Sequence, residues 1–315
     1  IMAGLVGSEM CIRDRGKVFS YNGNEIKYPD IKLVYWAGGN PFHHQMNLKK
    51  LIRAFKQPDT IIVNEIWWNS LARHSDIILP ATTSLERNDI SIKHWDQTIS
   101  PMYKAIEPIG ESKSDYEIFS EISSKLNFKD KFTEGKDEDK WLKFIWEEAK
   151  NKAKEEGFTL PEFEKFWKNG FQEVLSPKKQ TILLEEFRMN PENHPISTPS
   201  GKIEIFSETI DSFNYKDCPG HPTWLEQEEW LGSNLTKQFP LQLISGQPHN
   251  RLHSQLDNGS QSQNEKIRGR EPIKIHPHDA QTRKLENGDI VEVFNKRGKC
   301  LAGVIISEEV MKGVV

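Results

Sequence analysis

The stretch that decides the fold is IKLVYWAGG at residues 31–39, an apolar run that leads into two glycines. Its β-branched and aromatic residues are typical of a buried strand, and the glycine pair predicts a turn. TIIVNEIWW at 60–68 and DIILPATT at 76–83 have the same character. Between the strands, FHHQMNLKKLIRAFKQ at 42–57 and NSLARHS at 69–75 have helical patterns. This alternation predicts an α/β fold with a parallel sheet covered by helices.

The middle of the chain predicts a helical extension of this domain. Amphipathic patterns at residues 114–127, 137–157 and 161–170 favour three helices, and their tryptophans are expected in the core rather than at a ligand: Trp141, Trp146 and Trp167. After them, PSGKIEIFS at 199–207 predicts a turn followed by a short strand.

From about residue 238 the pattern changes to β. Strands are expected in FPLQLISGQP at 239–248, EPIKIHP at 271–277, IVEVFN at 290–295 and CLAGVIIS at 300–307, with one short helix in HPHDAQTRKL at 276–285. KRGK joins the last two strands as a hairpin turn. Short strands with one small helix predict a closed barrel.

Composition narrows the function classes. The formal net charge is −4 and the lysines are interleaved with acids, which gives no basic surface for nucleic acid. No apolar run approaches the roughly 20 residues of a membrane span. The cysteines Cys11, Cys218 and Cys300 form no CxxC pair, so a zinc ribbon or an iron–sulfur site is not expected.

Both ends of the chain look unusual. IMAGLVGSEMCIRDR at residues 1–15 lacks the basic start of a signal peptide and resembles translated sequencing adapter, so we expect it to lie outside the fold. The end, EEVMKGVV, stops inside a strand-like run, and the natural protein is expected to continue. We therefore expect a non-native tail at 1–15, an α/β dinucleotide-binding domain with its helical extension at 16–235, and a truncated barrel at 236–315.

Polar residues follow each strand of the predicted sheet. Ligands of parallel sheets bind at the carboxyl ends of the strands, where glycines let a phosphate or sugar approach the backbone. The candidates at these ends are Gly38, Gly39, Asn40, His44, Asn64, Glu65 and Arg87. Without a full GxGxxG motif, the alternative of a tight turn at GGNP and a structural ion pair at Arg87 stays open.

A second polar constellation is SGQPHNRLHSQ at residues 245–255. His249 and His253 invite a metal interpretation, but Pro248 disfavours a helix there and no acidic residue lies between them. A polar ligand-binding loop is expected instead. The sequence contains no GxSxG elbow and no Walker loop, so hydrolase chemistry has no support. No catalytic or metal-ligating residue is assigned.

An ordered set of motifs resembles one known family. WAGGNPFHHQ, ARHSDIILPATTSLERNDI, KSDYEIF, TPSGKIEIFS, CPGHPTW, RLHSQLDNG, GREP and NGDIVEVFNKRG occur in this order. From about residue 31 onward the chain is similar to the C-terminal half of the dimethyl sulfoxide, trimethylamine N-oxide and biotin sulfoxide reductases. RLHSQLDNG with GREP favours the biotin sulfoxide branch.

The resemblance implies a cofactor and its site. That family binds two molybdopterin guanine dinucleotides on one molybdenum, bis(molybdopterin guanine dinucleotide). It implies that the sheet domain holds one dinucleotide and that a double-psi barrel covers the pterins. The matching residues are Asn40, His44, Asn64, Arg87 and Asp115 in the first domain, and Ser245, Gln247, His253 and Ser254 in the second. Gln45 and Gln247 stand where relatives have histidine. The molybdenum ligand is expected outside this chain.

The resemblance also implies an activity. The intact enzyme is expected to reduce a small S-oxide or N-oxide by oxygen-atom transfer, with electrons from a donor protein, while the cofactor makes the bonds. Two alternatives stay open: a formate- or nitrate-type molybdopterin enzyme, and a non-catalytic nucleotide-binding module. Family habit favours the periplasm over the cytoplasm.

Overall fold

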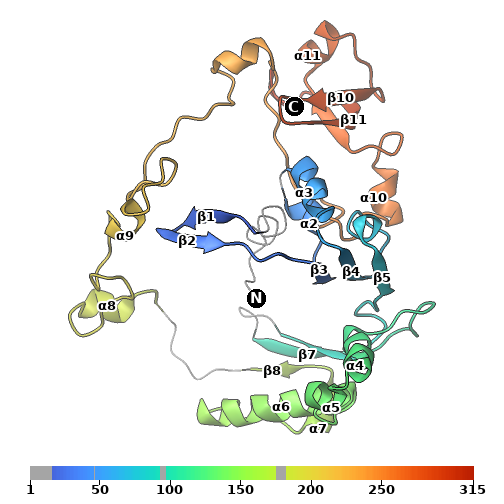
Figure 1. The fold of residues 1–315 in the computed structure, drawn as a ribbon. Coiled ribbons are helices and arrows are strands. Elements are labelled where there is room, and N and C mark those ends of the chain that lie inside the picture. Colours follow the sequence, from blue (N-terminus) through green and yellow to red (C-terminus); the bar gives the residue numbers. More distant parts are fainter. Residues whose placement is uncertain (1–15, 46, 93–96, 175–181) are drawn as a thin grey trace. The chain divides into compact units, whose positions relative to one another are not determined.

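The computed structural model describes residues 16–45, 47–92, 97–174 and 182–315 (Figure 1). The chain divides into two compact units. One unit contains the residues up to 31, residues 40–58 and residues 205–315, and the other contains residues 32–39 and 59–204. The expectation for residues 1–15 falls outside the described residues, and the domain boundaries expected from the sequence stay predictions.

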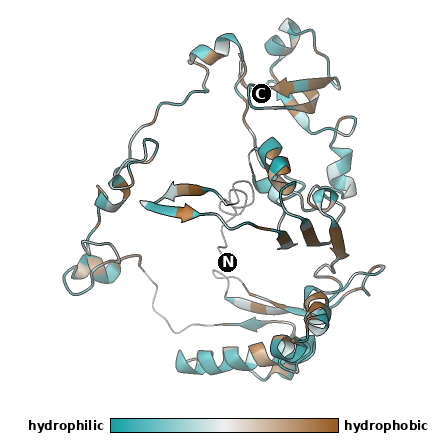
Figure 2. Ribbon diagram, in the orientation of Figure 1, coloured by the Kyte–Doolittle hydropathy of each residue, from teal (hydrophilic) through white to brown (hydrophobic). Residues whose placement is uncertain are grey.

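A three-stranded parallel sheet lies in the second unit, as predicted. Its strands are β3 (Leu33–Ala37), β4 (Thr60–Glu65) and β5 (Ile77–Pro80), in the order β3-β4-β5. Figure 2 shows these strands in hydrophobic colours. Ile61 and Val63 of the central strand are buried, so β4 anchors the sheet and fixes where Asn64 and Glu65 emerge at its end.

The connection from β3 to β4 contains two helices where one had been predicted. α2 (Pro41–His44) and α3 (Leu48–Phe55) each begin at an asparagine cap. The side chain of Asn40 accepts from the backbone N–H of Phe42, and that of Asn47 accepts from Lys50. The single helix was wrong because asparagine prefers to cap a helix rather than continue it. Met46 is outside the described residues.

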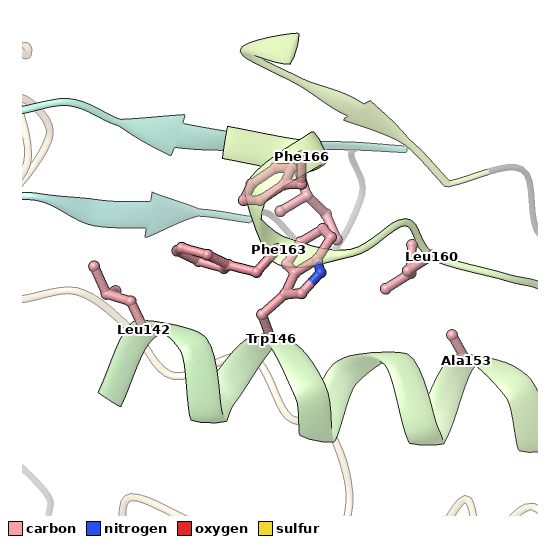
Figure 3. Close-up of a cluster of buried hydrophobic side chains, with 7 residues drawn as sticks. Leu142, Trp146, Ala153, Leu160, Phe163 and Phe166 are labelled. Carbon is pink, nitrogen blue, oxygen red and sulfur yellow. The ribbon is translucent and has the colours of Figure 1, made fainter. Parts of the chain in front are cut away.

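The helical extension is confirmed. A sheet of β6 (Asp89–Ser91), β7 (Thr98–Met102) and β8 (Gln172–Glu173) accompanies α4 (Asp115–Lys125), α5 (Lys129–Thr133), α6 (Glu138–Glu155) and α7 (Phe163–Asn169). Trp146 is 1% exposed and stacks on Phe166 with ring centroids 3.8 Å apart. Figure 3 shows Trp146 pointing from α6 toward Phe166 of α7. This tryptophan serves the core, as expected, and Trp141 and Trp167 are partly buried.

The strand expected at 199–207 was wrong. Ile203 and Ile205 are 66% and 82% exposed, and the segment lies between the short helices α8 (Glu185–Met189) and α9 (Glu208–Asp211). Local bonds replace a strand ladder here. The Thr198 hydroxyl donates to the carbonyl of Lys202, and the Glu204 carboxylate accepts from the N–H of Ser200. Such local bonds compete with sheet pairing.

The first unit ends in a second three-stranded sheet. β9 (Pro272–Ile275) pairs parallel with β11 (Lys299–Ile306), which pairs antiparallel with β10 (Ile290–Phe294). The helices α10 (Ser260–Asn264), α11 (Pro277–Thr282) and η2 (Asn234–Lys237) accompany it. Val304 and Ile275 are buried in the core of this sheet. These strands were predicted, but within the described residues they form an open sheet.

Two further features complete this unit. The strand expected at 239–248 is reduced to an extended segment in which Gln242 pairs with Val314. Near the first of the described residues, β1 (Val18–Tyr21) and β2 (Asn24–Lys27) form a hairpin. Its two turn residues, Asn22 and Gly23, have φ of 49° and 75°, as a two-residue hairpin turn requires.

No helix among the described residues is long and apolar enough to cross a membrane.

Candidate functional site

Three side chains meet at the carboxyl end of the parallel sheet. The hydroxyl of Tyr35 donates to Oδ1 of Asn64 over 2.7 Å, and Nδ2 of Asn64 donates to Oδ1 of Asp115 over 2.7 Å. Asn64 is 5% exposed, whereas Asp115 is exposed. We call Tyr35, Asn64 and Asp115 the strand-end cluster. It joins β3, β4 and the first turn of α4, and presents a carboxylate to solvent.

Local structure at the start of α4 fixes the position of Asp115. Ser114 caps the helix by accepting from the N–H of Glu117, whose carboxylate accepts from the N–H of Ser114 in return. Lys113 pairs with Ala81, just after β5. The two capping bonds satisfy backbone N–H groups at the start of the helix that would otherwise lack partners. The bridge to Ala81 ties the start of α4 to the end of β5, with or without a bound ligand.

Glu65 turns toward its own loop. One carboxylate oxygen accepts from the N–H groups of Ile66 and Trp67, and the other accepts from Nδ2 of Asn69 over 2.7 Å. The residue therefore shapes the loop after β4. The expected contact between Glu65 and a cofactor stays a prediction.

The loop after β5 is held by a buried carboxylate that the sequence reasoning passed over. Glu86 is 5% exposed and accepts from the backbone N–H and hydroxyl of Thr83, from the N–H of Ile109 and from the hydroxyl of Ser112. The bonds from Thr83 and Ile109 lower the pKa of Glu86 to about 2. Glu86 is thus ionised at neutral pH and fixes the backbone beside Arg87.

Arg87 forms an ion pair with Asp89. Their side chains are 34% and 35% exposed. This is the structural pairing that the sequence left open as an alternative. One guanidinium nitrogen is engaged, and a guanidinium has further donors in its planar fork. The pairing is compatible with a phosphate contact, which stays a prediction.

A second group of polar residues lies in the first unit, at residues 245–255, and we call it the loop cluster. The segment that follows β3 in the sequence reaches it. Nδ2 of Asn40 donates to the hydroxyl of Ser254 over 3.3 Å, and the rings of His44 and His253 lie 4.8 Å apart. Asn40 is 5% exposed. The structure thus brings together four residues that the sequence assigned separately.

Arg251 organises the loop cluster. Its side chain is 12% exposed and pairs with Asp257 at 3.5 Å and Glu271 at 3.1 Å. It also donates to the carbonyl of His253, while its own carbonyl accepts from Nε2 of Gln247 over 2.7 Å. Arg251 was not among the assigned site residues. No local pattern marked it, because its partners Asp257 and Glu271 both follow the polar loop in the sequence.

Electrostatics in this cluster favour a neutral polar ring, because the carboxylates of Asp257 and Glu271 already balance the charge of Arg251. Partial desolvation and the neighbouring Arg251 lower the pKa of His43, so His43 is neutral at neutral pH. Oδ1 of Asn250 is buried without a hydrogen-bond partner in the described part of the chain. A buried acceptor left in this way is unusual in native proteins, so it marks a place where a donor is needed.

The remaining assigned residues lie at exposed positions. Gly39 has φ of 76°, next to Gly38 at 81°, so both glycines adopt a conformation that other residues rarely reach. Ser245, Gln247 and His253 are exposed. Within residues 16–45, 47–92, 97–174 and 182–315, no group of three or more His, Cys, Asp or Glu side chains could hold a metal ion.

Comparisons with known proteins give consistent matches. Residues 7–125 match the family described as molybdopterin oxidoreductase, and residues 241–315 match the family described as molydopterin dinucleotide binding domain. The chain is 45% identical to a trimethylamine-N-oxide reductase from Haemophilus influenzae, over 95% of this chain and 37% of that protein. It is 42% identical to a biotin sulfoxide reductase from Cereibacter sphaeroides, over 98% of this chain and 41% of that protein.

Two further comparisons concern the range of relatives and the fold. The chain is 41% identical to a dimethyl sulfoxide/trimethylamine N-oxide reductase from Rhodobacter capsulatus, over 96% of this chain and 37% of that protein. The solved structure of acetylene hydratase from Pelobacter acetylenicus matches with a TM-score of 0.66 at 18% identity, over 99% of this chain and 39% of that one. The chain therefore spans about two fifths of the length of these proteins.

Proposed function

We propose that this chain, which belongs to the molybdopterin oxidoreductases, is the dinucleotide-binding part of a molybdenum-dependent reductase of S-oxides or N-oxides. The observation that carries the proposal is the strand-end cluster. An ordered amide and an exposed carboxylate lie at the carboxyl end of a parallel sheet, where such sheets bind nucleotides. The term complete enzyme is used below for the full-length protein of which this chain is a part.

The strand-end cluster fits a guanine base. The Asp115 carboxylate accepts from Asn64 through Oδ1, which leaves acceptor capacity toward solvent. Guanine offers two neighbouring donors, N1–H and the 2-amino group, that one carboxylate can receive. Near the end of β5, the hydroxyl of Thr82 is buried with no partner among the described residues. The donors and acceptors of this unit therefore suit a guanine nucleotide.

The loop cluster fits the polar rings of the rest of the cofactor. Arg251 holds the loop through its pairs with Asp257 and Glu271, and the unpartnered Oδ1 of Asn250 supplies an acceptor for a ring N–H. We propose that Asn40, His44, Ser245, Gln247, His253 and Ser254 contact the bound dinucleotides, and that Gly39 lets the cofactor approach the backbone. Arg87 is proposed to meet the diphosphate with its guanidinium fork.

When bound, the molybdenum cofactor supplies the redox chemistry for oxygen-atom transfer. This chain binds and orients the dinucleotides. We further propose that the open sheet of β9, β10 and β11 is part of a double-psi barrel in the complete enzyme. We also propose that an electron-donor protein reduces the complete enzyme and that the complete enzyme is located in the periplasm.

The test is made on the complete enzyme purified from a cofactor-producing host. Acid hydrolysis should release about two guanine nucleotides per molybdenum, and reduced viologen should drive turnover of trimethylamine N-oxide or biotin sulfoxide. Molybdenum with guanine but turnover of formate or nitrate instead would favour a different branch of the family. Guanine nucleotide without molybdenum would favour a non-catalytic module, and absence of both would contradict the proposal.

A further inference from the structure

The hydrogen bonds of the strand-end cluster have one permitted direction. An ionised carboxylate only accepts, so the group of Asn64 that faces Asp115 must be Nδ2. The other end of the amide, Oδ1, then faces Tyr35 and must accept. The hydroxyl of Tyr35 is consequently the donor. The Asp115 carboxylate and the Tyr35 hydroxyl therefore hold the Asn64 amide in the same orientation, one from each end.

The sheet explains why Tyr35 can reach Asn64. In the β3–β4 pairing, Tyr35 lies opposite Ile62 and Ala37 lies opposite Asn64. Tyr35 and Asn64 are therefore diagonal neighbours on one face, a separation that an aromatic side chain can cover. The ring of Tyr35 also lies 5.3 Å from that of Phe119 in α4. Tyr35 is thus held between the strand and the helix that carries Asp115.

The state of the hydroxyl is also fixed. Burial and the nearby Asp115 carboxylate raise the pKa of Tyr35 above its usual value. A raised pKa keeps the phenol protonated throughout the physiological range, so it remains a donor. The hydrogen bonds from Tyr35 to Asn64 and from Asn64 to Asp115 therefore keep the same direction throughout the physiological pH range.

We propose that Tyr35 is a positioning residue for nucleotide selection, which holds Asn64 and, through it, the Asp115 carboxylate in the orientation that receives a guanine edge. This inference rests on the proposed function and adds a residue to it. Without the hydroxyl, Oδ1 of the buried Asn64 side chain loses its donor, so the amide is held only at its Nδ2 end and can move toward another partner. The Asp115 carboxylate would then lose the fixed orientation in which it receives guanine.

The test compares nucleotides that differ in one donor. GDP offers N1–H and the 2-amino group, IDP keeps N1–H alone, and ADP presents a ring acceptor in place of N1–H. Their affinities are measured by calorimetry on the apoprotein of the complete enzyme, made in a host without the cofactor. The wild type should bind GDP best and ADP worst. Tyr35→Phe should lower the GDP-to-IDP affinity ratio about tenfold, the size expected for one hydrogen bond to a charged group.

A matched control lies one residue from Asp115. The Tyr116 hydroxyl donates to the carbonyl of Lys136 and accepts from Nε1 of Trp141 over 3.1 Å. Tyr116→Phe removes a bonded phenol hydroxyl from the same helix region without touching Asn64. It should lower the melting temperature and leave the GDP-to-IDP ratio unchanged. A purely structural Tyr35 would give the same pattern.

The outcomes separate the two proposals. If the wild type prefers GDP and Tyr35→Phe keeps that preference, the role of Tyr35 is overturned and the proposed function stands. If the wild type binds no nucleotide, or binds ADP as well as GDP, the assignment of guanine to this cluster fails, and the role of Tyr35 fails with it. Should Tyr35→Phe not fold, Phe119→Leu keeps the hydroxyl but loosens the ring, and the ratio should fall about two- to threefold. An unchanged ratio there would also overturn the role of Tyr35.

Discussion

The strand-end cluster and the loop cluster contain similar residue types, but they are held in different ways. Asn64 emerges from the central strand of a sheet, and its partners lie on β3 and α4. The loop cluster lies outside regular strands and helices, and its His253 has a positive φ. Secondary structure orders the first cluster, whereas ion pairs around Arg251 order the second. The loop cluster should therefore be more sensitive to loss of one side chain.

The largest effect is expected from Arg251→Met. The substitution leaves Asp257 and Glu271 without their closest guanidinium. Breaking a buried pair from one side costs about 3–5 kcal/mol, and we expect about 2–3 here because Asp257 and Glu271 are partly exposed and Lys266 stays 2.8 Å from Asp257. Urea unfolding measures the loss, and hydrogen exchange should rise in residues 251–257.

The control for this experiment is Arg297→Met. Arg297 pairs with Glu229, and their side chains are 66% and 45% exposed. An exposed pair contributes about 0–1 kcal/mol, so this variant should remain near the wild type. Equal losses in the two variants would mean that Arg251 does not order the loop cluster in the way described.

A smaller effect is expected from Glu86→Gln in the loop after β5. The amide keeps the shape but cannot accept all the bonds that the carboxylate receives, so unfolding should become about 1–3 kcal/mol easier at neutral pH. Because the pKa of Glu86 falls from 4.5 to about 2 on folding, its contribution is complete above pH 4.5 and disappears as pH falls toward 2. The gap between wild type and variant should close over that interval.

Urea titrations at pH 7 and pH 3 measure this gap. Glu121→Gln provides the comparison, because Glu121 is exposed and pairs with Lys113 at the surface. That variant should change stability little at either pH. A gap for Glu86→Gln that is as wide at pH 3 as at pH 7 would contradict the low pKa of Glu86.

The sequence predicted the features that depend on local patterns and missed those that depend on distant contacts. The strands β3, β4 and β5 were predicted because their apolar runs and glycine turns are local patterns. Their carboxyl ends located Asn64 by a general rule of parallel sheets. Asp115 lies 51 residues further along, and only the resemblance assigned it, because no local pattern reveals a contact at that separation.

The errors also have physical reasons. The strand expected at 199–207 had the right alternation but no partner strand, and local side-chain bonds satisfied its backbone instead. Tyr35 was interpreted as one more apolar residue of a buried strand, since a sequence does not show which hydroxyl meets an amide across the sheet. Arg251 was passed over because its acidic partners lie outside the motif.

Arg87→Lys in the complete enzyme tests the unit that contains the strand-end cluster, through the arginine proposed to meet the diphosphate. Lysine keeps the charge but loses the planar fork, so binding of the dinucleotide should weaken about tenfold. Molybdenum and guanine content should fall, while the apoprotein melts nearly unchanged, because the Arg87–Asp89 pair is about one third exposed. Arg73→Lys in η1 (Ala72–His74) is the control. Wild-type cofactor occupancy with a shifted apoprotein melting temperature would make Arg87 a structural residue.

The smallest effect concerns the two histidine rings that meet in the loop cluster. His44 ends helix α2, whereas His253 has φ of 50°. His44→Gly and His253→Gly remove the same ring contact, so the difference between them reports the backbone alone. Glycine costs about 0.5–1 kcal/mol in a helix, but it relieves strain where φ is positive. We therefore expect His253→Gly to be about 1 kcal/mol less destabilising than His44→Gly in urea unfolding. Equal losses, or a larger loss at His253, would mean that the left-handed conformation at this position is not maintained in solution, and the loop cluster would then lack the fixed backbone that distinguishes it here.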